Sequence, residues 1–214
     1  MKILIFLLVL VLLSCAEKKQ SENEVQQQQK INLISNDSFD QWDFVLSDSS
    51  VDAQTIWTLK DSIVHCSGAV NGYMRTKEKF SNYILNIDWR WPDEPGNSGV
   101  LLHITGADKV WPLCIEAQLM SGNAGDFYLI GGSTMREQED PSSNRVQKQN
   151  ESSERPAGEW NHYKIVVADS TITVFINDIK QNSASATSLQ KGMIGLQSEG
   201  KPIEFKNIFL EPLN

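Results

Sequence analysis

The chain has 214 residues, with 27 Asp and Glu against 19 Lys and Arg and a formal net charge of −8 at pH 7. An acidic surface disfavours binding to nucleic acid and to anionic lipid, because both carry charge of the same sign. Once a leader and a linker are set aside, the length suits one domain with a substantial core and leaves little room for a second.

The amino terminus has the features of an export signal. Lys2 precedes an apolar run over residues 3–13, which is too short to span a bilayer and ends at Ser14 and Cys15. The end of the run resembles the bacterial lipobox, which implies a signal peptide over residues 1–14 and a lipidated Cys15. The alternative is an ordinary secretory signal with an incidental cysteine. We expect a protein of the bacterial cell envelope, attached to the membrane through this lipid anchor alone.

The segment that follows the signal has little apolar content. Residues 15–35 include four consecutive glutamines at 26–29 and scattered charges. Such a segment buries too little apolar surface to fold by itself. We therefore expect a flexible tether over residues 15–35 and a single folded domain over residues 36–214.

The domain sequence consists of short strand patterns separated by turns. No long window shows helical periodicity, and turn residues such as Asp61, Gly96 and Gly200 separate the patterns. This organisation predicts an all-β sandwich of two antiparallel sheets. The expected strands are residues 55–59, 63–66, 72–75, 83–91, 99–104, 114–120, 126–130, 160–168, 171–177, 193–198 and 203–210.

Two of these strands show strict alternation of polar and apolar residues. Glu116 and Gln118 share one face of the first, and Asp88 and Arg90 share one face of the second. We expect all four side chains to project from the same concave sheet face. That face is either the floor of a binding cleft or a solvated surface.

The sequence leaves the state of two cysteines open and predicts no cofactor. Cys66 and Cys114 lie in expected strands of an exported domain, so they either form a disulfide or stay as buried free thiols. The three histidines lack the short spacing to other ligand residues that is typical of metal sites. No metal is predicted, although a divalent metal held by residues distant in sequence stays an open alternative.

One polar segment breaks the regular spacing of the strands. Residues 131–159 are rich in Ser, Glu, Gln and Arg and show no strand pattern. Loops of this length are usually functional or disordered. We expect residues 133–158 of this segment to be more mobile than the sandwich and to form a lid or rim of the cleft.

Several spaced motifs carry a resemblance to a known family. They are residues 89–92 (WRWP), 96–100 (GNSGV), 115–118 (IEAQ), 125–128 (GDFY), 158–161 (GEWN), 194–200 (IGLQSEG) and 203–208 (IEFKNI). With these motifs in this order, the chain resembles the 3-keto-disaccharide hydrolase domain family over roughly residues 39–212. The resemblance implies a concanavalin A-like jelly-roll sandwich whose concave sheet holds a saccharide site.

The family name indicates a reaction that follows from the chemistry of a keto sugar. A ketone at C3 acidifies the hydrogen on C2, so a base can remove it, the enolate can expel the glycosidic oxygen from C1, and water can then add. Such a site needs a base, a proton donor and a group that stabilises the enolate oxygen. Glu116 and His103 are the candidate base and acid, and the planar, permanently charged Arg90 is the candidate for the oxygen.

Each catalytic candidate also has a structural interpretation. Arg90 and Asp88 fit an ion-pair network on a solvated sheet face. His103 lies between apolar residues and fits a packed, hydrogen-bonded strand histidine. The expected substrate-binding residues, chosen for flat apolar rings or for hydrogen-bonding groups near the motif strands, are Asp88, Gln118, Trp91, Asn97, Trp111, Tyr128 and Glu199.

Two classes of function follow from these residues. The first is a hydrolase or lyase that acts on 3-keto-glycosides produced by a partner oxidoreductase. The second is a non-catalytic, lectin-like envelope protein that binds a saccharide. An enzyme needs a carboxylate and a second ionisable group converging in an enclosed pocket, whereas a lectin needs only aromatic and hydrogen-bonding groups.

The lipid anchor has a direct test. Cys15→Ala removes the acylated thiol, so we expect the precursor to stay uncleaved or the protein to be released in soluble form. Metabolic labelling with a fatty acid and membrane fractionation measure both effects. Unchanged processing and fractionation would contradict the lipoprotein interpretation.

Overall fold

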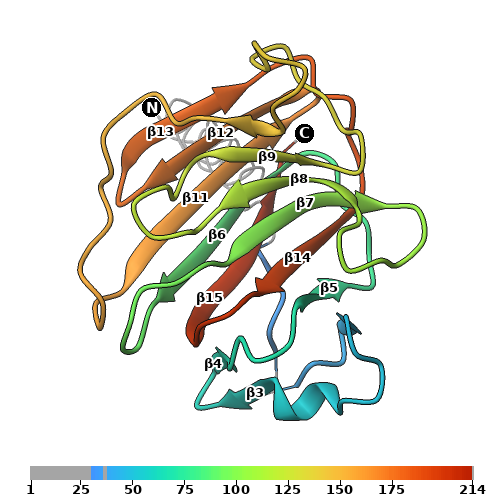
Figure 1. Ribbon diagram of the computed structural model, residues 1–214, viewed down its shortest axis with the longest axis vertical. Helices are drawn as coiled ribbons and strands as arrows, with labels where there is room; N and C mark the ends of the chain where they lie inside the picture. The colour runs from blue at the N-terminus through green and yellow to red at the C-terminus, as the bar shows by residue number, and fades with distance from the viewer. Residues whose placement is uncertain (1–29, 36–37, 214) are drawn as a thin grey trace, which may run out of the picture.

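Two antiparallel sheets packed face to face form the domain (Figure 1). The computed structural model describes residues 30–35 and 38–213. Within these residues, the one helical element is a 3-10 turn at Ala53–Thr55, where the Asp52 carboxylate accepts a hydrogen bond of 3.0 Å from the Gln54 N–H. The prediction of an all-β sandwich built from two antiparallel sheets is confirmed.

The first sheet has eight strands. Seven of them follow the spatial order β13-β12-β11-β6-β15-β4-β3, and β1 pairs with β15 beside this path. Their bounds are β1 (Ile31–Asn32), β3 (Trp57–Lys60), β4 (Ile63–Cys66), β6 (Tyr83–Arg90), β11 (Asn161–Ala168), β12 (Thr171–Ile176), β13 (Ile179–Ala184) and β15 (Ile203–Pro212).

The second sheet has seven strands in the order β10-β9-β8-β7-β14-β5-β2. Neighbouring strands in this order come from distant parts of the chain, because β14 from the carboxyl-terminal region lies between β7 and β5. The bounds are β2 (Trp42–Leu46), β5 (Gly72–Thr76), β7 (Gly99–Thr105), β8 (Leu113–Gln118), β9 (Phe127–Ile130), β10 (Arg145–Val146) and β14 (Met193–Ser198).

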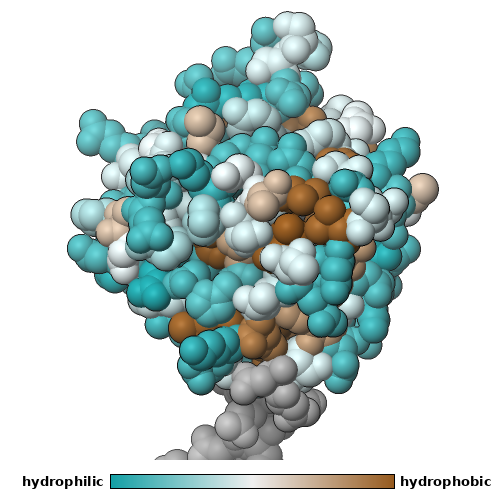
Figure 2. Space-filling view, turned by 60° about the horizontal axis from the view of Figure 1, so that its bottom comes forward, coloured by the Kyte–Doolittle hydropathy of each residue, from teal (hydrophilic) through white to brown (hydrophobic). Residues whose placement is uncertain are grey.

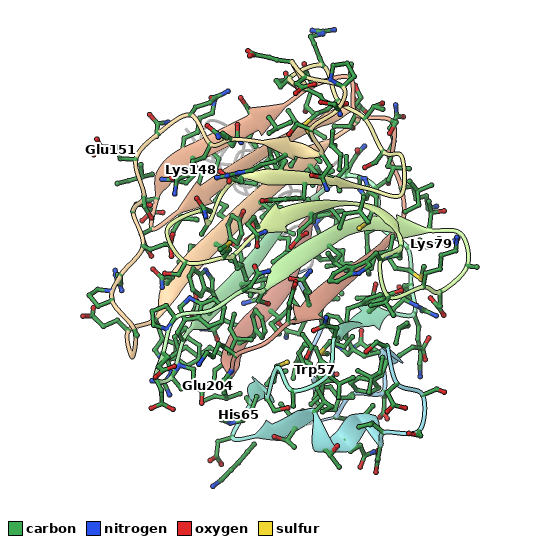
Figure 3. The ribbon with its side chains drawn as sticks, in the orientation of Figure 1. Trp57, His65, Lys79, Lys148, Glu151 and Glu204 are labelled. Carbon is green, nitrogen blue, oxygen red and sulfur yellow. The ribbon has the colours of Figure 1, made fainter. Side chains whose placement is uncertain are left out.

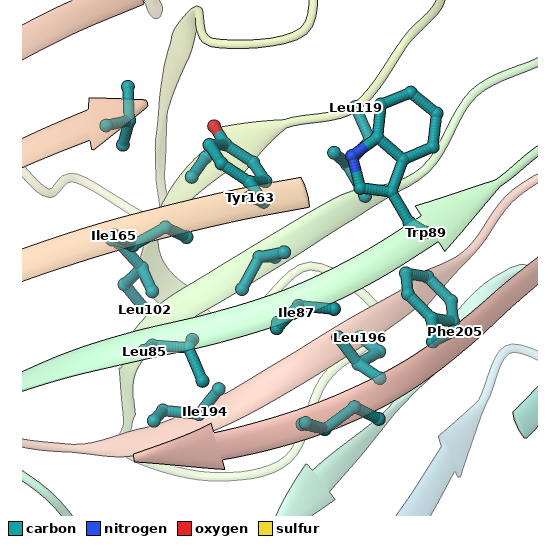
Figure 4. Close-up of a cluster of buried hydrophobic side chains, with 14 of the residues drawn as sticks. Leu85, Ile87, Trp89, Leu102, Leu119, Tyr163, Ile165, Ile194, Leu196 and Phe205 are labelled. Carbon is teal, nitrogen blue, oxygen red and sulfur yellow. The ribbon is translucent and has the colours of Figure 1, made fainter. Parts of the chain in front are cut away.

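The core lies between the two sheets and follows from the two-residue period of their strands. In β6, Leu85, Ile87 and Trp89 are buried against side chains such as Leu102 and Leu196 of the facing sheet (Figure 4). Burial of large apolar side chains is the main favourable contribution to folding. The polar residues that alternate with them therefore point out of the sandwich.

The surface of the molecule is largely hydrophilic on the face drawn in Figure 2, with hydrophobic atoms confined to a few areas. Among the residues that the structure describes, the exposed large apolar side chains are Trp111 and Met120, each 42% exposed, and Ile179 at 53%. Single exposed apolar residues are ordinary on protein surfaces. Trp111 and Met120, however, both line the same pocket.

All eleven expected strands are present, and the structure contains four further strands that the sequence interpretation missed. The missed strands are β1, β2, β10 and β13. The strand β1 also corrects the predicted boundary of the domain, because Leu33 is buried and its N–H donates a 2.9 Å hydrogen bond to the carbonyl of Ile208. Residues 30–35 therefore belong to the sandwich rather than to the tether.

The two cysteines of the domain are both free and buried. Cys66 lies in β4 of the first sheet and Cys114 in β8 of the second, so the two thiols belong to different sheets. Burial raises the pKa of the Cys66 thiol to about 11, which keeps it protonated and unreactive near neutral pH.

The predicted signal peptide, Cys15 and the tether up to residue 29 lie outside the described residues. Among the residues that the structure does describe, no helix has the length and apolar character to cross a membrane.

The corrected boundary can be tested by truncating Leu33. Leu33→Ala removes buried methyl groups from the core, so we expect the free energy of unfolding to fall by about 2–5 kcal/mol. Asn32→Ala, on the exposed side of β1, is the matched control and should change it by less than about 0.5 kcal/mol. Urea denaturation of both variants measures the difference. Equal free energies of unfolding for Leu33→Ala and Asn32→Ala would instead support a flexible tether over residues 30–35.

Candidate functional site

A pocket of about 400 Å³ lies on the outward face of the seven-stranded sheet. Its residues come from β8, β9 and β14 and from the loops beside them, so segments distant in sequence build it together. Pockets of this volume are typical of small-ligand sites. The lining residues are Asn97, Trp111, Glu116, Gln118, Met120, Tyr128, Leu129, Ile130, Gly131, Asn144, Gln197 and Glu199.

The register of the sheet decides which side chains reach this pocket. Directly paired residues on antiparallel strands point to the same face. Glu116 of β8 pairs with Leu101 of β7 on one side and with Tyr128 of β9 on the other. The complete row across the sheet is Asp43, Arg75, Gly195, Leu101, Glu116, Tyr128 and Arg145.

Glu116 is a buried carboxylate in the wall of the pocket. The residue is 4% exposed, and its Oε1 atom has no hydrogen-bond partner. The side chain lies over Gly99 of the neighbouring strand, where a Cβ atom would collide with the carboxylate. Glycine at position 99 is therefore required for Glu116 to take this position.

Burial changes the protonation of Glu116. Desolvation, with a further contribution from the negative charge of Glu199, raises the pKa of Glu116 to about 8. A carboxyl group with such a pKa holds its proton near neutral pH and can deliver it to a reacting oxygen. Strongly shifted groups of this kind occur preferentially in functional sites.

Glu199 supplies a second carboxylate to the same pocket. It follows β14 and is half-buried, and its segment forms an isolated β-bridge with Asn97. Burial raises the pKa of Glu199, while a hydrogen bond from Asn97 acts in the opposite direction. Because Glu199 is more exposed than Glu116 and has this donor, Glu199 is the carboxylate of the pair that ionises more readily.

Three buried oxygen atoms of the pocket residues lack hydrogen-bond partners. They are Oε1 of Glu116, Oδ1 of Asn97 and Oε1 of Gln197. A buried acceptor without a partner costs free energy unless a ligand or water satisfies it. The pocket therefore suits a ligand that carries several hydroxyl donors.

Gln118 offers a donor instead. Its Oε1 atom accepts hydrogen bonds from the backbone N–H groups of Leu119 and Met120, at 2.8 and 2.9 Å. These two bonds fix the orientation of the amide, because only the oxygen can accept from two N–H groups. The NH2 group of Gln118 is then the part of the amide that remains for a ligand.

The outer part of the pocket is apolar. Trp111 and Met120 are each 42% exposed and line it together with Tyr128. Flat aromatic faces bind apolar ligand surfaces, such as the C–H faces of a sugar ring, with little loss of side-chain entropy. The acceptors in the wall match the hydroxyl groups of a pyranose, and the indole at the mouth matches its C–H face.

The segment 131–159 borders the pocket, as predicted for a rim. Gly131 and Asn144 line the pocket, although the segment also contains the strand β10, which the sequence interpretation lacked. Arg145 ties it to the sheet through a 2.7 Å ion pair between its Nε atom and the buried carboxylate of Asp126. Greater mobility of this segment stays a prediction.

Arg90 and Asp88 do not belong to this pocket, so the prediction that they share a face with Glu116 is wrong. Both lie on β6, in the eight-stranded sheet, and point away from the core. Arg90 pairs with Glu204 at 2.6 Å. Glu204 also contacts His65 at 2.9 Å, and Figure 3 labels both of these residues. Alternation identified the polar face of the strand but carried no information about its sheet.

Asp88 has its own partners on that outer surface. One carboxylate oxygen contacts Nδ1 of His162 at 2.8 Å, and the other accepts a hydrogen bond of 2.6 Å from Asn207. Arg90 lies over the ring of Trp160, 4.6 Å from its centroid. The ion-pair interpretation of Asp88 and Arg90 therefore describes their surroundings.

His103 is also absent from the pocket. The pairing of β7 shifts register beside His103, whose φ angle of 57° marks a β-bulge. The bulge turns the ring toward Tyr83 in the sandwich interior, with a ring centroid distance of 6.0 Å, and places Nδ1 3.0 Å from the carbonyl of Leu189. Desolvation lowers the pKa of His103. It is a packed strand histidine.

Trp91 lies in the core rather than at the pocket. It is 3% exposed and packs edge-to-face on Trp89, with centroids 5.8 Å apart. The two tryptophans share the inward face of the strand end, so the two-residue period that buries Trp89 also buries Trp91.

Six predicted site residues do meet in the pocket. Their roles stay predictions, but their convergence matches the expectation for Glu116, Gln118, Asn97, Trp111, Tyr128 and Glu199. Sequence reasoning missed Gln197, although alternation with Glu199 on the strand end was a usable signal. It also missed Leu129 and Ile130 of β9, and the loop residues Met120, Gly131 and Asn144, which only the folding of the loops brings to the pocket.

No cluster of three or more His, Cys, Asp or Glu residues suited to a metal ion occurs within residues 30–35 and 38–213.

The protonation of Glu116 predicts a pH dependence of stability. The pKa of Glu116 is raised from its ordinary value of 4.5 to about 8, so the folded state holds a proton that the unfolded state releases. This contribution is fully present below pH 4.5 and is lost as pH rises toward 8. We expect wild type to lose stability relative to Glu116→Gln over this range, by at most about 1.4 kcal/mol per pH unit.

Denaturant unfolding at a series of pH values measures this difference. The matched control is Glu151→Gln, at an exposed position outside the pocket. Its stability difference from wild type should be independent of pH. A constant offset for Glu116→Gln as well would contradict the protonated state of Glu116.

The fold occurs in proteins that act on or bind carbohydrates. A candidate glycosyl hydrolase from Parabacteroides distasonis is similar with a TM-score of 0.65 and 18% identity, over 86% of this chain and 94% of that one. A family 66 carbohydrate-binding module from Bacillus subtilis has a TM-score of 0.56 and 12% identity, over 80% and 95%. The beta-glucanase of Bacillus licheniformis has a TM-score of 0.56 and 9% identity, over 88% and 100%.

These similarities establish a jelly-roll fold shared by glycosyl hydrolase-like proteins and carbohydrate-binding modules. A search of curated protein sequences finds no match. The model of one domain family matches residues 29–211, which is nearly the whole described chain. The chain belongs to the family of 3-keto-alpha-glucoside-1,2-lyase-like domains.

Proposed function

We propose that this protein cleaves the glycosidic bond of a saccharide that carries a ketone at C3. The observation that carries the proposal is the pair of carboxylates, Glu116 and Glu199, in one pocket lined by unpartnered hydrogen-bond acceptors. Membership of the family supports the keto-sugar substrate. The keto group implies a separate oxidoreductase reaction that supplies the substrate.

The different environments of the two carboxylates support different roles. Glu199 is half-buried and has the hydrogen bond from Asn97, so it is the base that removes the proton from C2. Glu116 is buried and protonated, so it is the acid. This assignment reverses the role expected for Glu116 from the sequence, and it follows the general pattern in which environment separates an acid from a base.

The reaction then proceeds in two balanced steps. Removal of the C2 proton by Glu199 gives an enolate, which restores the ketone as the C1–O bond breaks and a C1–C2 double bond forms. Glu116 donates its proton to the departing oxygen. Water then adds to C1, its proton returns to Glu116, and Glu199 gives its proton back to C2. Without this addition the product is an unsaturated keto sugar, which defines a lyase.

The enolate oxygen needs a donor, and Arg90 lies on the other sheet. The NH2 group of Gln118 is the pocket donor whose orientation the backbone already fixes. A preoriented donor stabilises developing negative charge without further reorganisation. Gln118 therefore takes the role that sequence reasoning gave to Arg90.

A second candidate function is saccharide binding without turnover. Binding requires no proton transfer. The exposed indole of Trp111 and the acceptors of Asn97 and Gln197 therefore suffice for it. A carbohydrate-binding module shares the fold. The two functions differ in whether the carboxylates matter for chemistry.

The test is turnover of a 3-keto-disaccharide by purified protein, with chromatography of the products. Glu116→Gln and Glu199→Gln keep the size of each side chain but remove its proton transfer, so each should lower kcat by roughly 10²–10⁴. Glu151→Gln is the control and should retain wild-type turnover. Deuterium at C2 should slow the wild-type reaction if proton removal limits it.

The pH profile provides a further measurement in the same assay. Activity should fall on the alkaline side as Glu116 loses its proton near pH 8, and on the acid side as Glu199 becomes protonated. Full activity of Glu116→Gln would contradict the acid role. Binding of the keto sugar by wild type with no product would favour the binding module instead.

A further inference from the structure

The loop that joins β7 to β8, residues 106–112, carries Trp111 to the pocket and is held at a distant point of the sheet. Figure 1 shows this loop projecting from the right-hand edge of the seven-stranded sheet. Trp111 lies at its carboxyl-terminal end and is 42% exposed, while the following residue, Pro112, is buried. The position of the indole therefore depends on how the rest of the loop is fixed.

Asp108 connects this loop to Arg75 of β5. The contact is bidentate: Nε of Arg75 lies 2.9 Å from Oδ1 of Asp108, and Nη2 lies 2.9 Å from Oδ2. Bidentate arginine–carboxylate pairs are stronger and geometrically more specific than single contacts. The side chain of Arg75 is 14% exposed and that of Asp108 is 44% exposed, so solvent reaches the pair mainly from the side of Asp108.

Arg75 itself is rigidly placed. It pairs across the sheet with Gly195 and Asp43, and its Nη1 atom contacts the carboxylate of Asp43 at 2.9 Å. It lies in the same row as Glu116, three strands away, which is about 14 Å at the usual strand spacing. The guanidinium is therefore a fixed point on the pocket face but outside the pocket.

A small apolar cluster fills the space between this fixed point and the pocket. Its members are Tyr73, Leu101, Ile104, Cys114 and Met193, separate from the main core. Ile130, which lines the pocket, packs against the same cluster. Burial raises the pKa of Tyr73 in this cluster to about 12, with a further contribution from the negative charge of Asp108.

We propose that Arg75 and Asp108 are positioning residues that latch the 106–112 loop across the outward sheet face and thereby hold Trp111 at the mouth of the pocket. The functional role of this contact rests on the proposed saccharide site, whereas the fixing of the loop by Arg75 and Asp108 does not depend on that site. Neither residue touches the pocket, so both act through Trp111.

The latch is tested first without any ligand. Asp108→Asn removes the charge of the pair and keeps the exposed Lys109 as a trypsin site in the loop. We expect cleavage after Lys109 to become about tenfold faster, because cleavage requires local opening. Asp43→Asn is the matched control, since it removes the other carboxylate partner of Arg75 and leaves the loop pair intact. Mass spectrometry identifies the fragment that starts at Val110.

Acrylamide quenching gives a second readout. The fluorescence of Trp111 is obtained as the difference in fluorescence between each protein and its Trp111→Phe counterpart. Acrylamide should quench this fluorescence more strongly in Asp108→Asn than in wild type or Asp43→Asn. Equal proteolysis and equal quenching in Asp108→Asn, Asp43→Asn and wild type would overturn the latch, whatever the catalytic activity.

The functional part is tested with the 3-keto-disaccharide of the turnover assay. Asp108→Asn should raise KM about tenfold and leave kcat within about twofold, as expected for lost binding rather than lost chemistry. Trp111→Ala should have the same effect. The double variant should be no worse than Trp111→Ala alone, because residues that act through one another are not additive. Full additivity would overturn the role in positioning Trp111.

The two proposals fail in different ways. If wild type turns over no 3-keto-disaccharide, the proposed function fails, while proteolysis and quenching still decide the latch. If turnover and the carboxylate variants behave as proposed but Asp108→Asn leaves the loop closed, the function stands and the latch is wrong.

Discussion

Register in the seven-stranded sheet determines the site, because it selects which residues point away from the core and which of them are neighbours. Glu116 lies between Leu101 and Tyr128 across the strands, and Gly99 beside it leaves room for its carboxylate. A shift of one residue in β8 would turn Glu116 into the core and Ile115 to the surface. The pKa of Glu116 and the shape of the pocket both follow from this placement.

The same placement has an energetic cost. A buried carboxyl group and the unpartnered oxygens of Asn97 and Gln197 destabilise the folded state, since each lost its bonds to water. Glu116 reduces the cost by staying protonated. A ligand with several hydroxyl groups would satisfy the remaining acceptors, so ligand binding would offset the free-energy cost of leaving them unpartnered in the folded protein. Conflicts of this kind concentrate at functional sites.

The two outer faces of the sandwich differ in this respect. On the eight-stranded sheet, Glu204 contacts both Arg90 and His65, and Asp88 contacts His162 and Asn207. These charged groups have partners, as structural ion pairs do. On the seven-stranded sheet, three acceptors in the pocket have none, namely those of Glu116, Asn97 and Gln197. The distinction between satisfied and unsatisfied polar groups therefore separates a solvated surface from a candidate site, although both surfaces have the same alternation in the sequence.

The amino-acid sequence alone determined the all-β class, most strand positions and the faces of individual strands, because a two-residue period is a local property of the chain. It also pointed to Glu116, Gln118 and Glu199. Only the tertiary structure decided which strands share a sheet, because that depends on pairing between residues far apart in sequence. That pairing separated Arg90 from Glu116, a local bulge turned His103 into the interior, and the folding of the loops brought Met120 and Asn144 to the pocket.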